Sequence, residues 1–173
     1  SGRKVVVTGL GLATALGLSV AENWRRALAG ESGVRALTGP ELAGAPVKAA
    51  GVVAAADFAS IQAAFPAEAR AEGERRTLFA LWAAREALGD AGFEGGSDRV
   101  GVALGAGLGI VRLEDVARWL DTAGRCDLAR FAREADRVHP ASQIRNPSDR
   151  PAALIARRHG LGGPNLTVTT ACA

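Results

Sequence analysis

Cys172 is the residue of this sequence best placed to do chemistry. The stretch before it reads as a Gly-Gly-Pro turn, a short β-branched strand and then small residues on both sides of the cysteine. A cysteine at a sharp junction between a strand and a following helix has its backbone amide and its sulfur pointing the same way, and the helix dipole favours its thiolate. The small neighbours leave room for a thioester. The pattern therefore predicts that Cys172 is a nucleophile.

Few other residues have side chains suited to catalysis or metal binding. Cys126 has no special neighbours, and we expect it to be a small buried residue. Two distant cysteines make neither a disulfide framework nor a zinc site, so no bound metal is expected. His139 and His159 are expected at the surface or at a helix end. A pairing of His159 with Cys172 stays open from the residues alone.

Two glycine-rich turns raise the alternative of nucleotide binding. Gly9-x-Gly11 follows a β-branched run, and Glu31 lies roughly 20 residues further on, where a ribose-binding acid is expected. However, Thr14 stands where the third glycine of that motif belongs, and the turn at 105–109 has the wrong spacing. The other interpretation is that both turns need glycine for close packing between a strand and a helix.

Strands and helices are expected to alternate along the chain. The expected strands are 5–8, 51–55, 99–104 and 166–169, and the expected helices are 20–29, 58–63, 74–91, 113–120 and 149–160. Residues 31–48 are expected to form a loop, and 66–73 to be polar and exposed. The alternation predicts an α/β architecture with a mainly parallel sheet.

Caps and periodicity predict where the helices begin and which faces are buried. Ser19 and Glu22 have the form of a capping box, in which the hydroxyl and the carboxylate each satisfy a free amide. Trp24 and Leu28 are expected on the inner face of that helix, and Asp149 is expected to cap the last helix. The inner face of helix 74–91 is expected to carry Leu78, Leu81, Trp82 and Leu88.

The composition is that of a soluble globular protein. The 173 residues suit one domain, with 48% hydrophobic and 23% charged residues. The net charge of +3 comes from arginines scattered among acids, so we expect no nucleic-acid binding. No stretch is long and apolar enough to predict a membrane span. Two unpaired cysteines fit a reducing, cytoplasmic setting.

The segment 160–173 resembles the nucleophile region of β-ketoacyl synthases, where a Gly-Leu-x-Gly-Pro turn precedes a strand that ends in Thr-Ala-Cys. Four further segments resemble that family in the same order along the chain. They are Val5–Gly11 as the opening strand and turn, Trp24, Leu28, Gly30 and Gly33 as a helix signature, 83–92 as the long helix, and 99–107 as the next strand and loop. The resemblance covers nearly all of this chain, but less than half of a typical family member.

The resemblance implies a layered αβαβα fold of the thiolase-like type, with residues 1–173 as an incomplete N-terminal β-ketoacyl synthase domain. It implies that Cys172 takes an acyl group as a thioester from an acyl carrier protein, and that its own N–H is one oxyanion donor. A malonyl carrier then loses carbon dioxide and its enolate attacks the thioester. No cofactor of its own is implied, because the phosphopantetheine arrives on the carrier protein.

The resemblance also implies groups that this sequence does not contain. Family catalysis uses two histidines and a lysine that lie well after the nucleophile, and neither His139 nor His159 matches those positions. The helix expected after Cys172 is missing as well. We therefore expect the 173 residues alone to neither fold stably nor catalyse condensation. The resemblance further implies a homodimer, or a heterodimer with a synthase-like subunit.

Three positions remain open between two roles. Arg75 and Arg76 begin the long helix, and they are either solvated or in contact with the acidic carrier protein. Asp149 stands where many relatives have Asn, which predicts either a helix cap or an altered acyl pocket or partner gate.

The leading functional hypothesis is an acyltransferase that extends an acyl-thioester in fatty acid or polyketide synthesis. The second is a non-catalytic, synthase-like partner subunit that shapes chain length, and the presence of Cys172 speaks against it. The third is a nicotinamide oxidoreductase, which depends on the imperfect glycine turn at Gly9.

Overall fold

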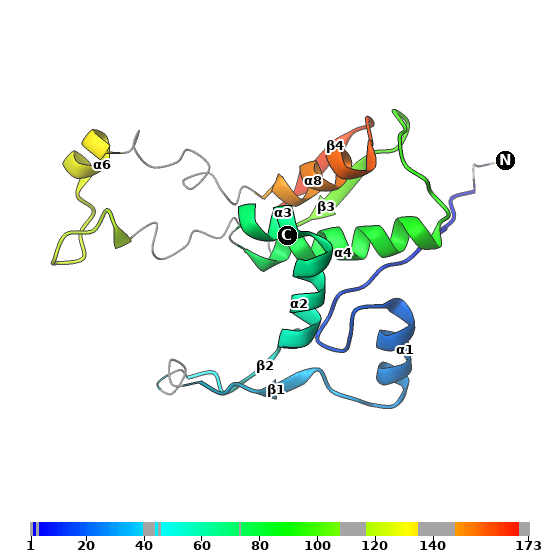
Figure 1. Ribbon diagram of the computed structural model, residues 1–173, viewed down its shortest axis with the longest axis horizontal. Coiled ribbons are helices and arrows are strands. Elements are labelled where there is room, and N and C mark those ends of the chain that lie inside the picture. Colours follow the sequence, from blue (N-terminus) through cyan, green and yellow to red (C-terminus); the bar gives the residue numbers. More distant parts are fainter. Residues whose placement is uncertain are drawn as a thin grey trace.

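Helices and short strands follow one another along the chain in the computed structural model (Figure 1), which describes residues 2, 4–39, 44, 46–72, 74–107, 117–134 and 148–169. The elements are α1 (Val20–Leu28), β1 (Val34–Ala36), β2 (Ala49–Gly51), α2 (Ala55–Ala64), α3 (Pro66–Ala71), α4 (Arg75–Asp90), β3 (Val102–Gly105), α6 (Leu128–Glu134), α8 (Arg150–His159) and β4 (Asn165–Val168). The predicted α/β class is confirmed.

The strands of the described residues form two pairs. β3 and β4 are parallel, with Val102 opposite Asn165 and Gly105 opposite Val168. β1 and β2 form an antiparallel hairpin within residues 31–51, where the sequence predicted mainly loop. The parallel pairing brings the carboxyl ends of β3 and β4 to one edge, which is where a residue following β4 must emerge.

α8 packs against both α4 and the β3–β4 pair (Figure 1). Their contact forms the core, together with one side of α2. The buried hydrophobic residues of this cluster are Ile61, Phe65, Leu78, Leu81, Leu154, Ile155 and Leu161. Burying each such side chain contributes about 1.5–3 kcal/mol, so α4 and α8 are held together mainly by this contact.

The β3–β4 pair is covered on one face only. Val102 and Leu104 of β3 and Thr167 of β4 are half-buried. On the other face, Leu166 is 60% exposed and Val168 is 54% exposed. Parallel sheets in proteins are normally buried on both faces, so this open face is an apolar surface without a partner among the described residues.

The predicted cap of α1 is confirmed, but its predicted inner face is wrong. Ser19 Oγ accepts from the Glu22 amide at 3.2 Å, and the Glu22 carboxylate accepts from the Leu18 amide at 3.2 Å. Trp24 and Leu28 are 67% and 71% exposed.

Asn23 is the residue of α1 that is buried in their place. Its side-chain amide donates to the carbonyls of Gly17 at 3.0 Å and Ser19 at 2.8 Å. Hydrogen bonds to the preceding turn therefore anchor the helix, and the side that hydrophobic periodicity predicted as the inner face is exposed.

The predicted strand at residues 5–8 is absent. Val5, Val6 and Val7 are 94%, 72% and 78% exposed, and they belong to no strand. β-branched residues favour a strand only where a neighbouring strand offers hydrogen bonds and packing. No described strand lies beside this segment to provide them.

The ends of the two core helices were predicted in part. α4 matches the expected 74–91, and Glu74 caps it by accepting from the Thr77 amide at 3.0 Å. α8 ends at Gly160, which has a left-handed φ of 63°, as predicted, but Asp149 makes no side-chain cap bond. Residues 66–71 form α3 where an exposed polar stretch was predicted, and of the predicted helix 113–120 only 117–120 are described.

No helix within the described ranges has the combination of length and apolarity that a bilayer crossing requires.

Candidate functional site

The carboxyl edge of the β3–β4 pair is the described part of the structure that precedes the predicted nucleophile in the sequence. The pairing continues one residue past the strands, because the Ala106 amide donates to the Val168 carbonyl at 2.9 Å. Thr169 is the last described residue of this segment and is exposed. Cys172 itself lies outside the described residues. β4, which precedes it in the sequence, ends at this edge because it runs parallel to β3.

Two side chains converge on one carbonyl at the same edge. Arg76, in the first turn of α4, donates from Nη1 to the Gly107 carbonyl at 3.3 Å. Ser148, just before α8, donates from Oγ to the same carbonyl at 3.2 Å. From the sequence, Arg76 was predicted for a different contact, Gly107 was predicted only as part of a glycine turn, and no role was predicted for Ser148. Nothing local to Ser148 distinguishes it, because its partner is 41 residues away.

Arg75 lies beside Arg76 but in a different environment. Its guanidinium carbon is 4.1 Å from the centre of the Phe58 ring and 5.6 Å from that of Phe79. Arg75 is exposed, whereas the Arg76 side chain is only 20% exposed. A cation held over aromatic faces keeps its charge accessible while losing little further freedom on binding. Of the two predicted carrier contacts, Arg75 is thus the one that faces solvent.

The glycine turn at the N-terminus packs tightly against α4. A Cβ at Gly9 would lie 2.1 Å from the Ala87 carbonyl oxygen, and one at Gly11 would lie 1.9 Å from that of Ala83. Only glycine permits this approach, so the packing interpretation of the turn agrees with the structure.

The backbone amides that a dinucleotide phosphate would need are already occupied. The Leu10 amide donates to Asp90 Oδ2 at 3.0 Å, and the Leu12 amide donates to Glu86 Oε2 at 2.9 Å. Two carboxylates at this turn would also repel a pyrophosphate. The geometry therefore disfavours the oxidoreductase hypothesis.

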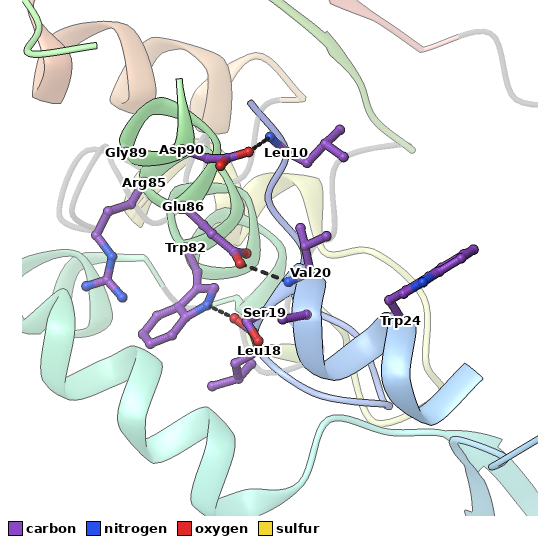
Figure 2. A pocket seen from close by; sticks show the side chains of 11 residues that line it. Leu10, Leu18, Ser19, Val20, Trp24, Trp82, Arg85, Glu86, Gly89 and Asp90 are labelled. Carbon is purple, nitrogen blue, oxygen red and sulfur yellow. Dashed lines mark hydrogen bonds between the residues drawn. The ribbon is translucent and has the colours of Figure 1, made fainter. Parts of the chain in front are cut away.

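A pocket of about 680 Å³ opens between the N-terminal segment, α1 and the second half of α4 (Figure 2). Figure 2 shows the Trp82 indole N–H donating to the Leu18 carbonyl, at 2.6 Å, and the Val20 amide donating to Glu86 Oε1, at 2.8 Å. Trp24 stands at its rim and is largely exposed. Arg76 and Glu86 are ten residues apart on α4, about 15 Å along the helix, so the pocket is separate from the strand edge.

Cys126 and His159 are the other candidate residues that the structure describes. Cys126 is exposed, so its prediction as a buried residue is wrong. His159 is half-buried at the end of α8, where burial and then the neighbouring Arg158 lower the pKa of its imidazole. His139 lies outside the described residues. In the described part of the chain, no three His, Cys, Asp or Glu side chains are grouped to hold a metal ion.

The chain matches the family model described as "Beta-ketoacyl synthase, N-terminal domain" over residues 2–173. It is 30% identical to the "3-oxoacyl-[acyl-carrier-protein] synthase 2" of Coxiella burnetii, over 98% of this chain and 39% of that protein. It is 34% identical to the "Putative 3-oxoacyl-[acyl-carrier-protein] synthase, mitochondrial" of Schizosaccharomyces pombe, over 99% of this chain and 40% of that protein. The solved structure "The ishigamide ketosynthase/chain length factor" superposes with a TM-score of 0.64 at 24% identity, over 98% of this chain and 40% of the other.

These similarities extend along the whole chain, although the chain spans only about 40% of the length of the relatives. The structural likeness confirms the predicted thiolase-like fold class. All the segments that resembled the synthases in the sequence lie within the residues that the family model matches. On the match over residues 2–173, this chain belongs to the β-ketoacyl synthase family and corresponds to its N-terminal domain.

Proposed function

We propose that this chain supplies the nucleophile of a 3-oxoacyl-[acyl-carrier-protein] synthase, and that Cys172 is that nucleophile. The single observation that carries the proposal is the parallel register of β3 and β4, which delivers the chain to a shared carboxyl edge four residues before Cys172. Family membership through residue 173 supports the same assignment.

The proposed reaction has two stages. The Cys172 thiolate attacks the carbonyl carbon of an acyl-carrier thioester, a new carbon–sulfur bond forms, and the carrier's phosphopantetheine leaves as a thiol after taking up a proton. The Cys172 N–H donates to the oxyanion that forms on the way. A malonyl carrier then loses carbon dioxide, the freed electron pair makes an enolate carbon that attacks the Cys172 thioester, and the thiolate is released. No cofactor bound by this chain is needed.

Arg75 is proposed to contact the carrier protein. Its guanidinium is exposed over Phe58 and Phe79 and lies one residue from Arg76, which reaches the strand edge through Gly107. A cation beside the site would attract the acidic carrier and orient it. Arg76 was predicted for the same contact, and its hydrogen bond to Gly107 leaves it less exposed for that role.

A second synthase-type subunit, identical or related, is proposed to cover the open apolar face at Leu166 and Val168 in a cytoplasmic dimer. Both side chains are more than half exposed on a parallel pair, a state that such pairs rarely tolerate. Leu166→Lys should shift the sedimentation profile of the full chain toward monomer, whereas Leu128→Lys, at a leucine of α6 that is 71% exposed, should not. An unchanged profile for Leu166→Lys would contradict the dimer at this face.

The acylation test uses the intact mass of the full chain after incubation with a short acyl-carrier thioester. An adduct of the acyl mass is expected in the protein and in Cys126→Ser, and it should be absent in Cys172→Ser. Failure of Cys172 to acylate while a complex with a second synthase subunit still forms would support the non-catalytic partner role instead.

Carrier binding is tested separately from acylation. Arg75→Glu should weaken the affinity for the acyl carrier protein by about tenfold or more, since it replaces attraction by repulsion. Arg130→Glu on α6 is the matched charge reversal and should leave the affinity within about twofold of the wild type. Equal losses in both variants would mean that net charge, and not this contact, governs binding.

A further inference from the structure

The end of β3 and the approach to α8 meet at one carbonyl. Residue Gly107 follows β3 and Ser148 precedes α8, and the Ser148 hydroxyl donates to the Gly107 carbonyl at 3.2 Å. Arg76 Nη1 donates to the same oxygen at 3.3 Å. One carbonyl therefore joins the first turn of α4, the end of β3 and the approach to α8.

The Arg76 guanidinium is held in place by a buried acid. Its Nε lies 3.7 Å from Oε2 of Glu74, whose side chain is only 3% exposed. Glu74 in turn accepts from the Thr77 amide and from the Thr77 hydroxyl, so its position is fixed by the start of α4. A guanidinium that is ordered by one partner loses little further entropy when it donates to a second.

The Gly107 carbonyl is linked to the strand edge by its neighbour. Ala106, the adjacent residue, donates its amide to the Val168 carbonyl at 2.9 Å. A displacement of Gly107 would therefore reach the last residue of β4 through one residue and one hydrogen bond. Cys172 follows Val168 by four positions in the sequence.

We propose that Arg76 is a positioning residue, which fixes the Gly107 carbonyl and through it the strand edge from which Cys172 follows. This inference rests on the proposed role of Cys172 as nucleophile. It separates the two adjacent arginines: Arg75 faces solvent over aromatic rings, and Arg76 is committed inward.

The test is the rate at which iodoacetamide alkylates Cys172 in the full chain, measured by peptide mass mapping as a function of pH. Cys126 is exposed in the same molecule and serves as the reference thiol. The ratio of the two rates cancels differences in reagent and handling. Each variant is first checked for an unchanged melting temperature by circular dichroism.

Arg76→Ala should lower the ratio of the Cys172 rate to the Cys126 rate by about tenfold, the size expected from losing one charge-assisted hydrogen bond. Arg76→Lys should lose about threefold, because a point charge cannot reach both Gly107 and Glu74 as the fork does. Arg157→Ala, at an exposed arginine of α8, is the matched control and should leave the ratio unchanged. A ratio in Arg76→Ala within about twofold of the wild type would overturn the proposal.

If Arg76→Ala lowers the melting temperature, Ser148→Ala is the variant that tests the proposal. It removes the other donor to the same carbonyl without touching a charge, and it should lower the ratio by about threefold. An unchanged ratio in that variant would also contradict the proposal. A wild-type ratio no greater than one, by contrast, would count against Cys172 as an activated nucleophile. The change of the ratio in Arg76→Ala would still test the positioning role of Arg76.

Discussion

Arg150 donates hydrogen bonds from two of its nitrogens to the buried carboxylate of Glu72. Nη2 lies 2.6 Å and Nε 3.0 Å from Glu72 Oε1, and the Glu72 side chain is only 2% exposed. The pair joins the residue after α3 to the first residue of α8, across 78 positions of sequence. Glu72 also raises the pKa of the Arg150 guanidinium, chiefly through the side-chain hydrogen bond, so this guanidinium stays charged.

The two partners of this ion pair differ in burial, so we expect their substitutions to differ in cost. Arg150→Met should destabilise the fold by about 2–4 kcal/mol, because it leaves a buried carboxylate unpaired. Glu72→Gln should cost less, about 1–2 kcal/mol, because the Arg150 side chain is 40% exposed and can turn to water. Urea unfolding monitored by circular dichroism measures both. The double variant should cost less than the sum of the two, and strict additivity would show that the pair does not act as a unit.

The packing of the N-terminal turn predicts opposite effects for two glycine substitutions. Gly11→Ala places a methyl group 1.9 Å from the Ala83 carbonyl oxygen, and displacing the turn should cost about 1–3 kcal/mol. Gly89→Ala, within α4, meets no atom within 4 Å and should stabilise the helix by about 0.5–1 kcal/mol. Thermal melts of the two variants should therefore shift in opposite directions. A tolerated Gly11→Ala would mean that the turn does not rest against α4.

Glu86 is predicted to secure both ends of the turn between the N-terminal segment and α1. Its two carboxylate oxygens accept from the Leu12 amide at 2.9 Å and the Val20 amide at 2.8 Å. Glu86→Ala should cost about 1–3 kcal/mol and should speed hydrogen exchange at both amides, because the exposed Leu12 amide and the partly buried Val20 amide lose their acceptor.

Glu86→Gln keeps one acceptor oxygen and should restore protection to only one of the two amides. Exchange rates that stay as in the wild type in Glu86→Ala would show that water satisfies these amides equally well.

The lowered pKa of the His159 imidazole predicts that the fold loses stability in mild acid. Burial, and secondly Arg158, lower the pKa of its imidazole below the ordinary 6.5, so the unfolded chain binds a proton more readily than the folded one. Between the two pKa values stability rises with pH, and it falls as the pH drops below about 6.5. Urea midpoints between pH 5 and pH 8 should show this slope in the wild type. The slope should be smaller in His159→Gln, and an equal slope in that variant would assign the effect to other groups.

The sequence alone determined the features that depend on near neighbours. The extent of α4, the Ser19 cap and the glycine stop at Gly160 were predicted because each is set by residues within one helical turn. The order of family segments was likewise readable, and with it the thiolase-like class and the candidate Cys172. The glycine requirement at Gly9 and Gly11 was predicted as well, although only the fold named α4 as the surface they approach.

Only the tertiary structure decided which distant groups meet. The Glu72–Arg150 pair, the Glu86 contact with Val20 and the two donors on Gly107 join residues 31 to 78 positions apart, and no periodicity encodes such separations. The same limit explains the exposed Trp24 and the unpaired Val5, because burial and strand formation depend on what stands opposite. Local preference states what a segment can form, and packing against the rest of the molecule selects which face and which partner it uses.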